Sequence, residues 1–507
     1  MHRPMHRRRA FVNHLQFTME KEVEVIRKAS HACFRCRARK QGCDRALPHC
    51  SRCSLKLRCC DYSLPSCRPT LPLSPRPQLL PTQAYVELGA GGLDLTAWGQ
   101  AGLMASVWDV SSQSATGEPS DSTFTKKVAL VLSEYQVTGH LLIDHYHSSI
   151  HDWFPVLDAN RFRTHLSNRH EAAISPYVEL VCLLLMLVTG KPTRRKSTTQ
   201  TSRLYITVRA LVATLQAQTH PSLLMLQASA ILALYECGQG MARQAHMTLS
   251  GAVAIAGLLD LQASAEMEEE FLHCKLGLLT LDRMIVLSSI KDTLSLLCPP
   301  SSPLSMSVQR HFSDPFVAKA SDSGRSTSAE RLHATAEALL LAGRILQHVN
   351  SSRAGLPVDE GEYNMLTAEA HGLADFLMRH GQGHTWPFCG PIIITLNCMV
   401  TMHQERVRRT GAKPGSRESS SLQASRRLAW DTCRIPIHDI KDTSVIPSLS
   451  FVCMCCAFRA AAVILEAADD LALPGEVEML LCALDLFRQR WRVGDTFLPG
   501  ISGKPVV

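Results

Sequence analysis

The sequence of 507 residues lacks the short motifs that mark the common enzyme classes. It contains no Walker phosphate loop, no dinucleotide-binding glycine fingerprint, no nucleophile elbow and no His-Glu-x-x-His pair. The run Gly238-Gln239-Gly240 has none of the other residues of a phosphate loop, so we interpret it as a helix break. These absences predict a protein that is not an enzyme, with no catalytic residues and no organic cofactor.

Long apolar runs and an export signal are also missing. The longest apolar run, near Leu180–Val188, is too short to cross a bilayer, and the N-terminus does not read as a signal peptide. We therefore expect no membrane partner and a reducing compartment, where disulfides are rare. Twelve of the 19 cysteines are scattered singly or on apolar faces, a pattern typical of reduced cysteines. Cys453, Cys455 and Cys456 lie in an apolar helical run, so we expect them to be free core residues, with a redox or zinc role as the alternative.

Strand-like alternation is scarce, and most of the chain has the apolar periodicity of helices. Ten ranges are predicted to be helical: Lys126–His147, Pro176–Val188, Ser222–Tyr235, Met241–Leu259, Met267–Ser289, Glu330–Val349, Tyr363–Arg379, Gly390–Arg408, Ser448–Ala468 and Gly475–Arg490. Loops are predicted at Lys191–Ser202, Asp314–Ser328 and Gly411–Ser425.

Composition divides the chain into four parts. Residues 1–28 form a basic tail, residues 29–64 a cysteine-rich head, residues 65–123 a linker and residues 124–507 a large all-α body. The linker has six prolines between Pro65 and Pro81 and is then rich in glycine and serine, so it cannot bury enough surface to fold. No a/d heptad is sustained over three repeats there, which leaves monomer and homodimer both open.

Positive charge is concentrated at the N-terminal end. Residues 1–60 contain 15 Lys and Arg against four Asp and Glu, a net charge of +11. The whole chain carries +8, so residues 61–507 carry about −3. A basic head on a nearly neutral body indicates that nucleic acid is the partner of the head.

Seven cysteines lie within the 28 residues from Cys33 to Cys60, and six of them repeat one spacing. The C-x2-C-x6-C frame occurs twice, 17 residues apart; its members are Cys33, Cys36, Cys43, Cys50, Cys53 and Cys60. Cys59 falls outside this repeat. Because zinc takes four ligands in a tetrahedron, six thiolates are too many for one ion and too few for two separate ions. The count closes for two zinc ions when Cys33 and Cys50 each bridge both metals.

This stretch resembles the fungal two-zinc, six-cysteine cluster family of transcription factors. The resemblance includes the basic run Arg37-Ala38-Arg39-Lys40, Asp44 after the third cysteine, Pro48 between the halves and Tyr62 after the last cysteine. Gly42 departs from the pattern, since a basic or bulky residue is common there. The resemblance implies two short helices around two zincs, of which the first, Phe34 to about Gln41, enters the major groove of double-stranded DNA.

The resemblance also implies a role for each basic residue of the head. Arg39 and Lys40 match the base-reading positions, which favour guanine in CGG-type half-sites. Phosphate contacts are expected from the other basic side chains: Arg35, Arg37, Arg52, Lys56 and Arg58. The family implies a nuclear regulator of genes read by RNA polymerase II that contacts the transcription machinery. Such regulators often control one pathway, secondary-metabolite clusters included.

The body resembles the regulatory domain of the same family. The segments that carry this likeness are Leu142–His147, Trp153–Leu157, Arg161-Phe162 and Leu281-Asp282-Arg283. The resemblance implies effector response, self-association or cofactor contact for the body. Together the resemblances of the head and the body cover roughly residues 30–300, and the last 200 residues carry no motif that we recognise.

Other interpretations of the head remain open. Its cysteines could form a disulfide knot or a zinc finger with one ion, although the spacing fits neither well. A zinc-stabilised protein-interaction module without a DNA target would have the same cysteines. A body with unrecognised catalytic chemistry would need a large pocket with converging ionisable groups.

Overall fold

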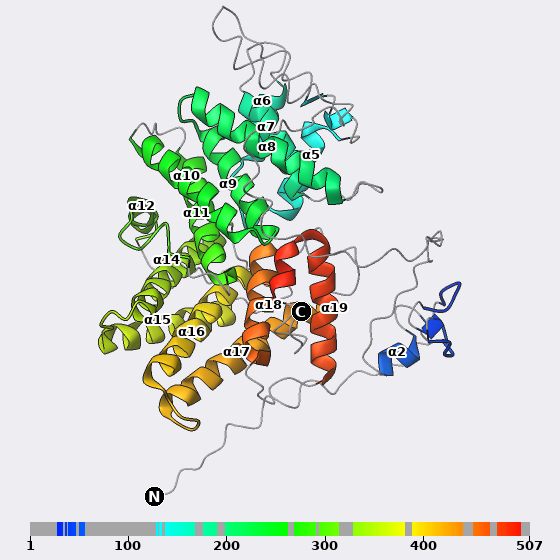
Figure 1. Ribbon diagram of the computed structural model, residues 1–507, viewed down its shortest axis with the longest axis vertical. Coiled ribbons are helices and arrows are strands. Elements are labelled where there is room, and N and C mark those ends of the chain that lie inside the picture. Colours follow the sequence, from blue (N-terminus) through cyan, green and yellow to red (C-terminus); the bar gives the residue numbers. More distant parts are fainter. Residues whose placement is uncertain are drawn as a thin grey trace, which may run out of the picture. The chain divides into compact units, whose positions relative to one another are not determined.

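The computed structural model of the chain divides into two units, Met1–Gln78 and Leu79–Val507 (Figure 1). Each unit is considered by itself. The structure describes residues 28–33, 36–37, 39–46, 50–55, 128–129, 131–133, 137–167, 176–189, 198–261, 268–289, 294–313, 328–380, 388–439, 450–466 and 474–497. The predicted tail and linker lie outside the described residues, except for Lys28 at the end of the tail.

The first unit contains little regular structure among its described residues. It has one helical turn at Cys36–Arg37, the short helix α2 (Ser51–Leu55) and an isolated antiparallel bridge between Lys28 and Ala46. Such short elements cannot be stable on their own, because the entropy lost in fixing the backbone of one helical turn exceeds the free energy that its hydrogen bonds contribute.

The regular structure in the described part of the second unit consists of helices. Its first helices are α5 (Gly139–Ser149), α6 (Ala159–Ser167), α7 (Pro176–Val188), α8 (Thr198–Gln218), α9 (Leu223–Gly238), α10 (Ala242–Asp260), α11 (Glu268–Ser288) and α12 (Pro303–His311). The later ones are α14 (Ser328–Arg353), α15 (Glu360–His380), α16 (Cys389–Thr410), α17 (Arg417–Asp439), α18 (Phe451–Glu466), α19 (Pro474–Arg490) and the 3-10 turn η6 (Arg492–Thr496).

Two helices organise this unit. Helix α9 packs against α7, α10 and α11, and nearly all of its residues are buried, as expected of a helix that is apolar on every side. Helix α16 packs against α14, α15, α17 and α18, the yellow-to-orange group in Figure 1. None of the described helices is long and apolar enough to cross a membrane.

Most predicted helices are present, but three boundaries are wrong. Lys126–His147 is not one helix, because Val137 and Thr138 are not helical. Thr138 is extended, and its hydroxyl accepts from Leu141 N at 3.2 Å, which caps α5. Helix α17 begins at Arg417, inside the predicted Gly411–Ser425 loop, and α8 begins four residues before the end of another predicted loop. None of the predicted helical ranges covers α6, α8, α12 or α17, so sequence reasoning missed these four helices. The apolar stripes of α6 and α12 are short.

A buried ion pair, Asp282 with Arg283, joins α11 to two other segments. Both side chains are fully buried. The Asp282 carboxylate accepts from the backbone N–H groups of Leu297 (2.9 Å) and Cys298 (3.2 Å), while Arg283 donates to the carbonyl of Cys298 (2.9 Å) and to that of Leu339 in α14 (3.3 Å). These bonds supply partners for the Asp282 carboxylate and for Nε and Nη1 of Arg283, as buried charges need.

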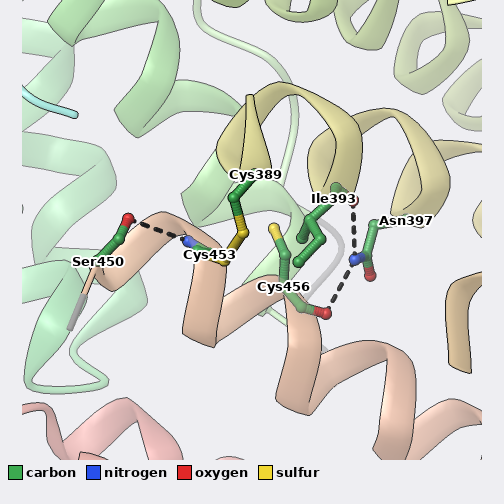
Figure 2. Close-up of a disulfide and its surroundings, with 6 residues drawn as sticks. All are labelled: Cys389, Ile393, Asn397, Ser450, Cys453 and Cys456. Carbon is green, nitrogen blue, oxygen red and sulfur yellow. Dashed lines mark hydrogen bonds between the residues drawn. A yellow bond between two sulfur atoms is a disulfide. The ribbon is translucent and has the colours of Figure 1, made fainter. Parts of the chain in front are cut away.

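The expectation that every cysteine of the body is reduced is wrong at Cys389, Cys453 and Cys482, which are disulfide-bonded. Cys389 and Cys453 are bonded to each other, and this disulfide joins α16 to α18 (Figure 2). Cys455 is a buried thiol, as predicted, and desolvation raises its pKa well above the ordinary value. The sequence could not reveal the bridge, because its two halves are 64 residues apart and lie in different helices.

The packing around Arg283 gives a test of the fold. A methyl group added at Gly343 in α14 would clash with the Arg283 guanidinium, which its hydrogen bonds hold in place. We expect Gly343→Ala to destabilise the protein by about 1–3 kcal/mol. Gly251→Ala in α10, where nothing lies within 4 Å of the added carbon, should instead stabilise by about 0.5–1 kcal/mol. Denaturant unfolding of both variants measures the contrast, and equal effects would contradict this packing.

Candidate metal centre

Four cysteines of the first unit converge on one point. The Sγ atoms of Cys33, Cys36, Cys43 and Cys50 all lie within 4.8 Å of one another. These are the three cysteines of the first C-x2-C-x6-C frame together with Cys50, which the sequence argument expects to bridge both metals. Outside the cysteines of this unit, the described residues contain no group of three or more Cys, His, Asp or Glu side chains that could hold a metal ion.

Two short turns bring these cysteines together. In the first half, Arg37 N donates to Cys33 O at 3.0 Å and Gln41 N donates to Cys36 O at 2.8 Å, so the chain after Cys33 winds into a helical turn. In the second half, Cys53 N donates to the Cys50 sulfur at 3.4 Å at the start of α2. A C-x2-C spacing across such a turn places both sulfurs on one side.

The distances between sulfurs fit a tetrahedral metal site. Cys33 Sγ lies 3.9 Å from Cys50 Sγ and 3.7 Å from Cys53 Sγ, and Cys36 Sγ lies 3.8 Å from Cys50 Sγ and 4.0 Å from Cys53 Sγ. Zinc–sulfur bonds of about 2.3 Å at tetrahedral angles place sulfurs about 3.8 Å apart. The donor set therefore fits zinc.

The geometry alone permits two four-sulfur sets. One consists of Cys33, Cys36, Cys43 and Cys50, and the other replaces Cys43 with Cys53. Cys33 lies close to a cysteine of the other half, and so does Cys50, as the bridging scheme requires. Cys60, the sixth ligand predicted, lies outside the described residues.

These sulfurs form the whole core of the head. The buried apolar residues in the described part of this unit are Cys33, Cys36, Cys50 and Cys53, with Cys43 packed against them. Desolvation and hydrogen bonds with Cys33 and Cys50 raise the pKa of Cys36 to about 12. Thiols in this environment hold their protons unless a cation replaces them, which is the exchange that accompanies zinc binding.

Asp44 ties the two halves together. Its carboxylate accepts from Ser51 N, which lies 3.1 Å from both of its oxygens, and from the Ser51 hydroxyl. These hydrogen bonds from Ser51 lower the pKa of Asp44. Because Ser51 begins α2 and follows Cys50, this contact fixes the second half against the loop of the first. The family resemblance singled out Asp44 in the sequence but did not indicate which residue it contacts.

The predicted DNA-contacting residues are placed as follows. Arg39, Lys40 and Arg52 are exposed, and Arg37 is partly buried. Arg35, Lys56 and Arg58 lie outside the described residues. The backbone of Lys40 has φ +50, in the left-handed region that glycine adopts most readily. The sequence gave no sign of this conformation, since neither Lys40 nor its neighbours is a residue that favours it.

Three of the body motifs, Leu142–His147, Trp153–Leu157 and Arg161-Phe162, are linked by hydrogen bonds and an ion pair. The Tyr146 hydroxyl donates to Phe154 O and accepts from Val156 N at 3.1 Å. Gln227 in α9 donates to Val156 O at 2.9 Å and to the Glu270 carboxylate at 2.6 Å, and Glu270 also pairs with Arg161 at 3.0 Å. These contacts are internal, so the three motifs help to hold the fold.

Comparison with known proteins gives one informative match. The chain is 29% identical over 148 residues to "Transcription factor BOA15" of Botryotinia fuckeliana, a stretch that is 29% of this chain and 77% of the relative. No family model matches the chain, and no solved structure matches it. The chain is thus similar to a fungal transcription factor and carries a cluster of four cysteines near its N-terminus.

Metal content tests the ligand set. We expect about two zinc ions per chain, because six thiolates with two bridges complete two tetrahedra. Cys50→Ser should lower the ratio below one, since it removes a ligand from both ions, whereas Cys59→Ser should leave it at two. Atomic absorption of the purified full-length variants measures this. A wild-type ratio of one, with Cys43→Ser unchanged, would instead assign a single zinc to the other four-sulfur set.

Removal of the Asp44 carboxylate tests the link between the halves. Asp44→Ala should weaken zinc binding about 10-fold or more, as loss of supporting contacts commonly does. Ser51→Ala keeps the backbone donor and should have a smaller effect. The pKa of Asp44 is lower in the folded protein than its ordinary value. The contribution of the carboxylate to stability is therefore complete when the pH is above the ordinary pKa, and it is lost as the pH falls through the lowered pKa of the folded state. A chelator competition assay at neutral pH measures both variants, and an unchanged zinc affinity in Asp44→Ala would refute the link.

Proposed function

We propose that this protein is a zinc-dependent transcription regulator that binds specific DNA sequences through its N-terminal head. The observation that best supports this proposal is the convergence of four cysteine sulfurs close in sequence to an exposed pair of basic residues, Arg39 and Lys40. Similarity to a transcription factor supports the same function. The strong positive charge of residues 1–60 supports a polyanionic partner.

Zinc in this proposal is structural. Two ions held by Cys33, Cys36, Cys43, Cys50, Cys53 and Cys60 would have closed all-sulfur shells, with no open position for water or substrate. The metal supplies charge neutralisation of the thiolates and cross-linking of the two halves. The cysteines position the turn that bears Arg39 and Lys40, and Asp44 sets the second half against it.

Lys40 is the best candidate for a base contact. Its side chain is exposed at the end of the first helical turn, where Lys40 N donates to Arg37 O at 3.1 Å. The left-handed backbone at this position costs a residue with a Cβ about 1–2 kcal/mol relative to glycine. A lysine in this strained conformation indicates that its side chain has a functional role. Lysine and arginine donate to O6 and N7 of guanine, so CGG-type half-sites are the expected targets.

Arg52 and the other basic residues of the head would bind phosphates. Arg52 is exposed on α2, the helix tied to Asp44 through Ser51. Phosphate contacts supply affinity and orientation but no sequence information. The protein would act in the nucleus, with the helical body available for self-association, effector response or contact with the transcription machinery. Control of a single pathway, such as a secondary-metabolite cluster, fits a regulator of this build.

Substitutions at position 40 separate the side chain from the backbone. Lys40→Ala and Lys40→Gly should both lose about 1–3 kcal/mol on the preferred site and relax the preference there. Lys40→Gly should bind zinc at least as tightly as the wild type, because glycine adopts the left-handed backbone without strain. Fluorescence anisotropy with specific and random duplexes, paired with zinc competition, measures both effects.

Arg52→Ala is the matched contrast for a phosphate contact. It should weaken binding to all sequences alike and make the salt dependence shallower by about one charge. If Arg52→Ala altered sequence preference while Lys40→Ala did not, the two roles would be reversed. If the zinc-loaded protein bound no duplex above background at low salt, the head would be a protein-interaction module instead.

A further inference from the structure

The cysteines of the second unit fall into two chemical groups. Most are deeply buried thiols, and desolvation raises the pKa of Cys237, Cys298 and Cys398 to about 12. Such thiols carry almost no thiolate and do not react at neutral pH. Cys389, Cys453 and Cys482 differ because they are disulfide-bonded. Cys389 and Cys453 form a disulfide with each other between α16 and α18, with Cα atoms 6.3 Å apart (Figure 2).

Both bridged cysteines lie in the first turn of a helix. Cys389 is the first residue of α16. Cys453 is the third residue of α18, and its backbone N donates to the Ser450 hydroxyl at 3.4 Å, which caps that helix. The positive end of a helix stabilises a thiolate, so each sulfur is placed to leave as an anion or to attack as one.

The two sulfurs differ in access. Cys389 is partly exposed, whereas Cys453 is about 5% exposed and sits among the core residues of α18. Cys389 is therefore the more accessible of the two residues to a thiol from solution. Attack on an accessible sulfur with a stabilised leaving group is the favourable course of thiol–disulfide exchange.

The contact between α16 and α18 does not depend on the bridge alone. Asn397, two turns further along α16, donates to the Cys456 carbonyl of α18 at 2.8 Å and accepts from Arg459 at 3.0 Å (Figure 2 shows the first of these bonds). Opening the disulfide would free the first turns of both helices while these bonds hold the rest. The bridge can thus break without unfolding the unit.

We propose that Cys389 and Cys453 are a reversible thiol–disulfide pair, opened and closed by small thiols of the glutathione type that react at the Cys389 sulfur. In opening, a glutathione thiolate attacks Cys389 Sγ, the S–S bond breaks and Cys453 leaves as a thiolate. A second glutathione thiolate then attacks the glutathione sulfur of the mixed disulfide, releasing Cys389 and oxidised glutathione. Each cysteine thiolate takes a proton from water, and oxidised glutathione runs the sequence in reverse.

Differential alkylation of the folded full-length protein, read by peptide mass mapping, tests the pair. Reduced glutathione should convert Cys389 and Cys453 to thiols without denaturant, and Cys389 should then take an alkylating label at least about tenfold faster than Cys398. Oxidised glutathione should restore the bridge. Cys482 is also disulfide-bonded, and the peptide maps read it separately.

Two variants locate the point of attack. Cys453→Ala should accumulate glutathione on Cys389, because no second thiol remains to expel it, and Cys389→Ala should accumulate none on Cys453. Cys398→Ala, in the same helix, should behave as the wild type. A bridge that opens only when the protein is unfolded, or an adduct found on Cys453 rather than Cys389, would overturn the proposal. Failure of DNA binding would leave these readouts unaffected.

Discussion

The head of this protein has cysteine sulfur where other small domains have a hydrophobic core. In its described part the buried apolar residues are cysteines, and its regular structure is one helical turn and a helix of five residues. Hydrophobic burial on this scale cannot offset the conformational entropy of ordering the chain. Coordination bonds to a metal can, because metal binding supplies folding free energy directly. Every role proposed for Arg39, Lys40 and Asp44 depends on that cross-link.

The second unit is instead stabilised by a large hydrophobic core. Helices α9 and α16 are each covered by neighbouring helices, and a continuous apolar core runs through the unit. This abundance of core allows polar groups to be buried where they fix the arrangement, as at Asp282 and Arg283. It also allows the first turns of α16 and α18 to be joined by a bond that the remaining contacts do not require.

Sequence patterns predicted what depends on local spacing. The range Pro176–Val188 was predicted to the residue, because a run that is apolar except for Glu179 begins at a proline that favours a helix start. The C-x2-C-x6-C repeat named the cysteines that the structure brings together at Cys33, Cys36, Cys43 and Cys50. Helix α17 was missed because its polar, serine-rich beginning has the composition of a loop. The Asp44–Ser51 contact, the left-handed Lys40 and the Cys389–Cys453 bridge arise from the path of the folded chain, which residue periodicity does not record.

Selection of bound sequences from a random DNA pool tests the central claim most directly, with the same full-length protein in zinc-loaded and chelator-stripped forms. The account predicts that the zinc-loaded form enriches CGG-type triplets, that the stripped form enriches no sequence, and that added zinc restores the selection. Equal enrichment without metal, or no enrichment by the loaded protein, would contradict it.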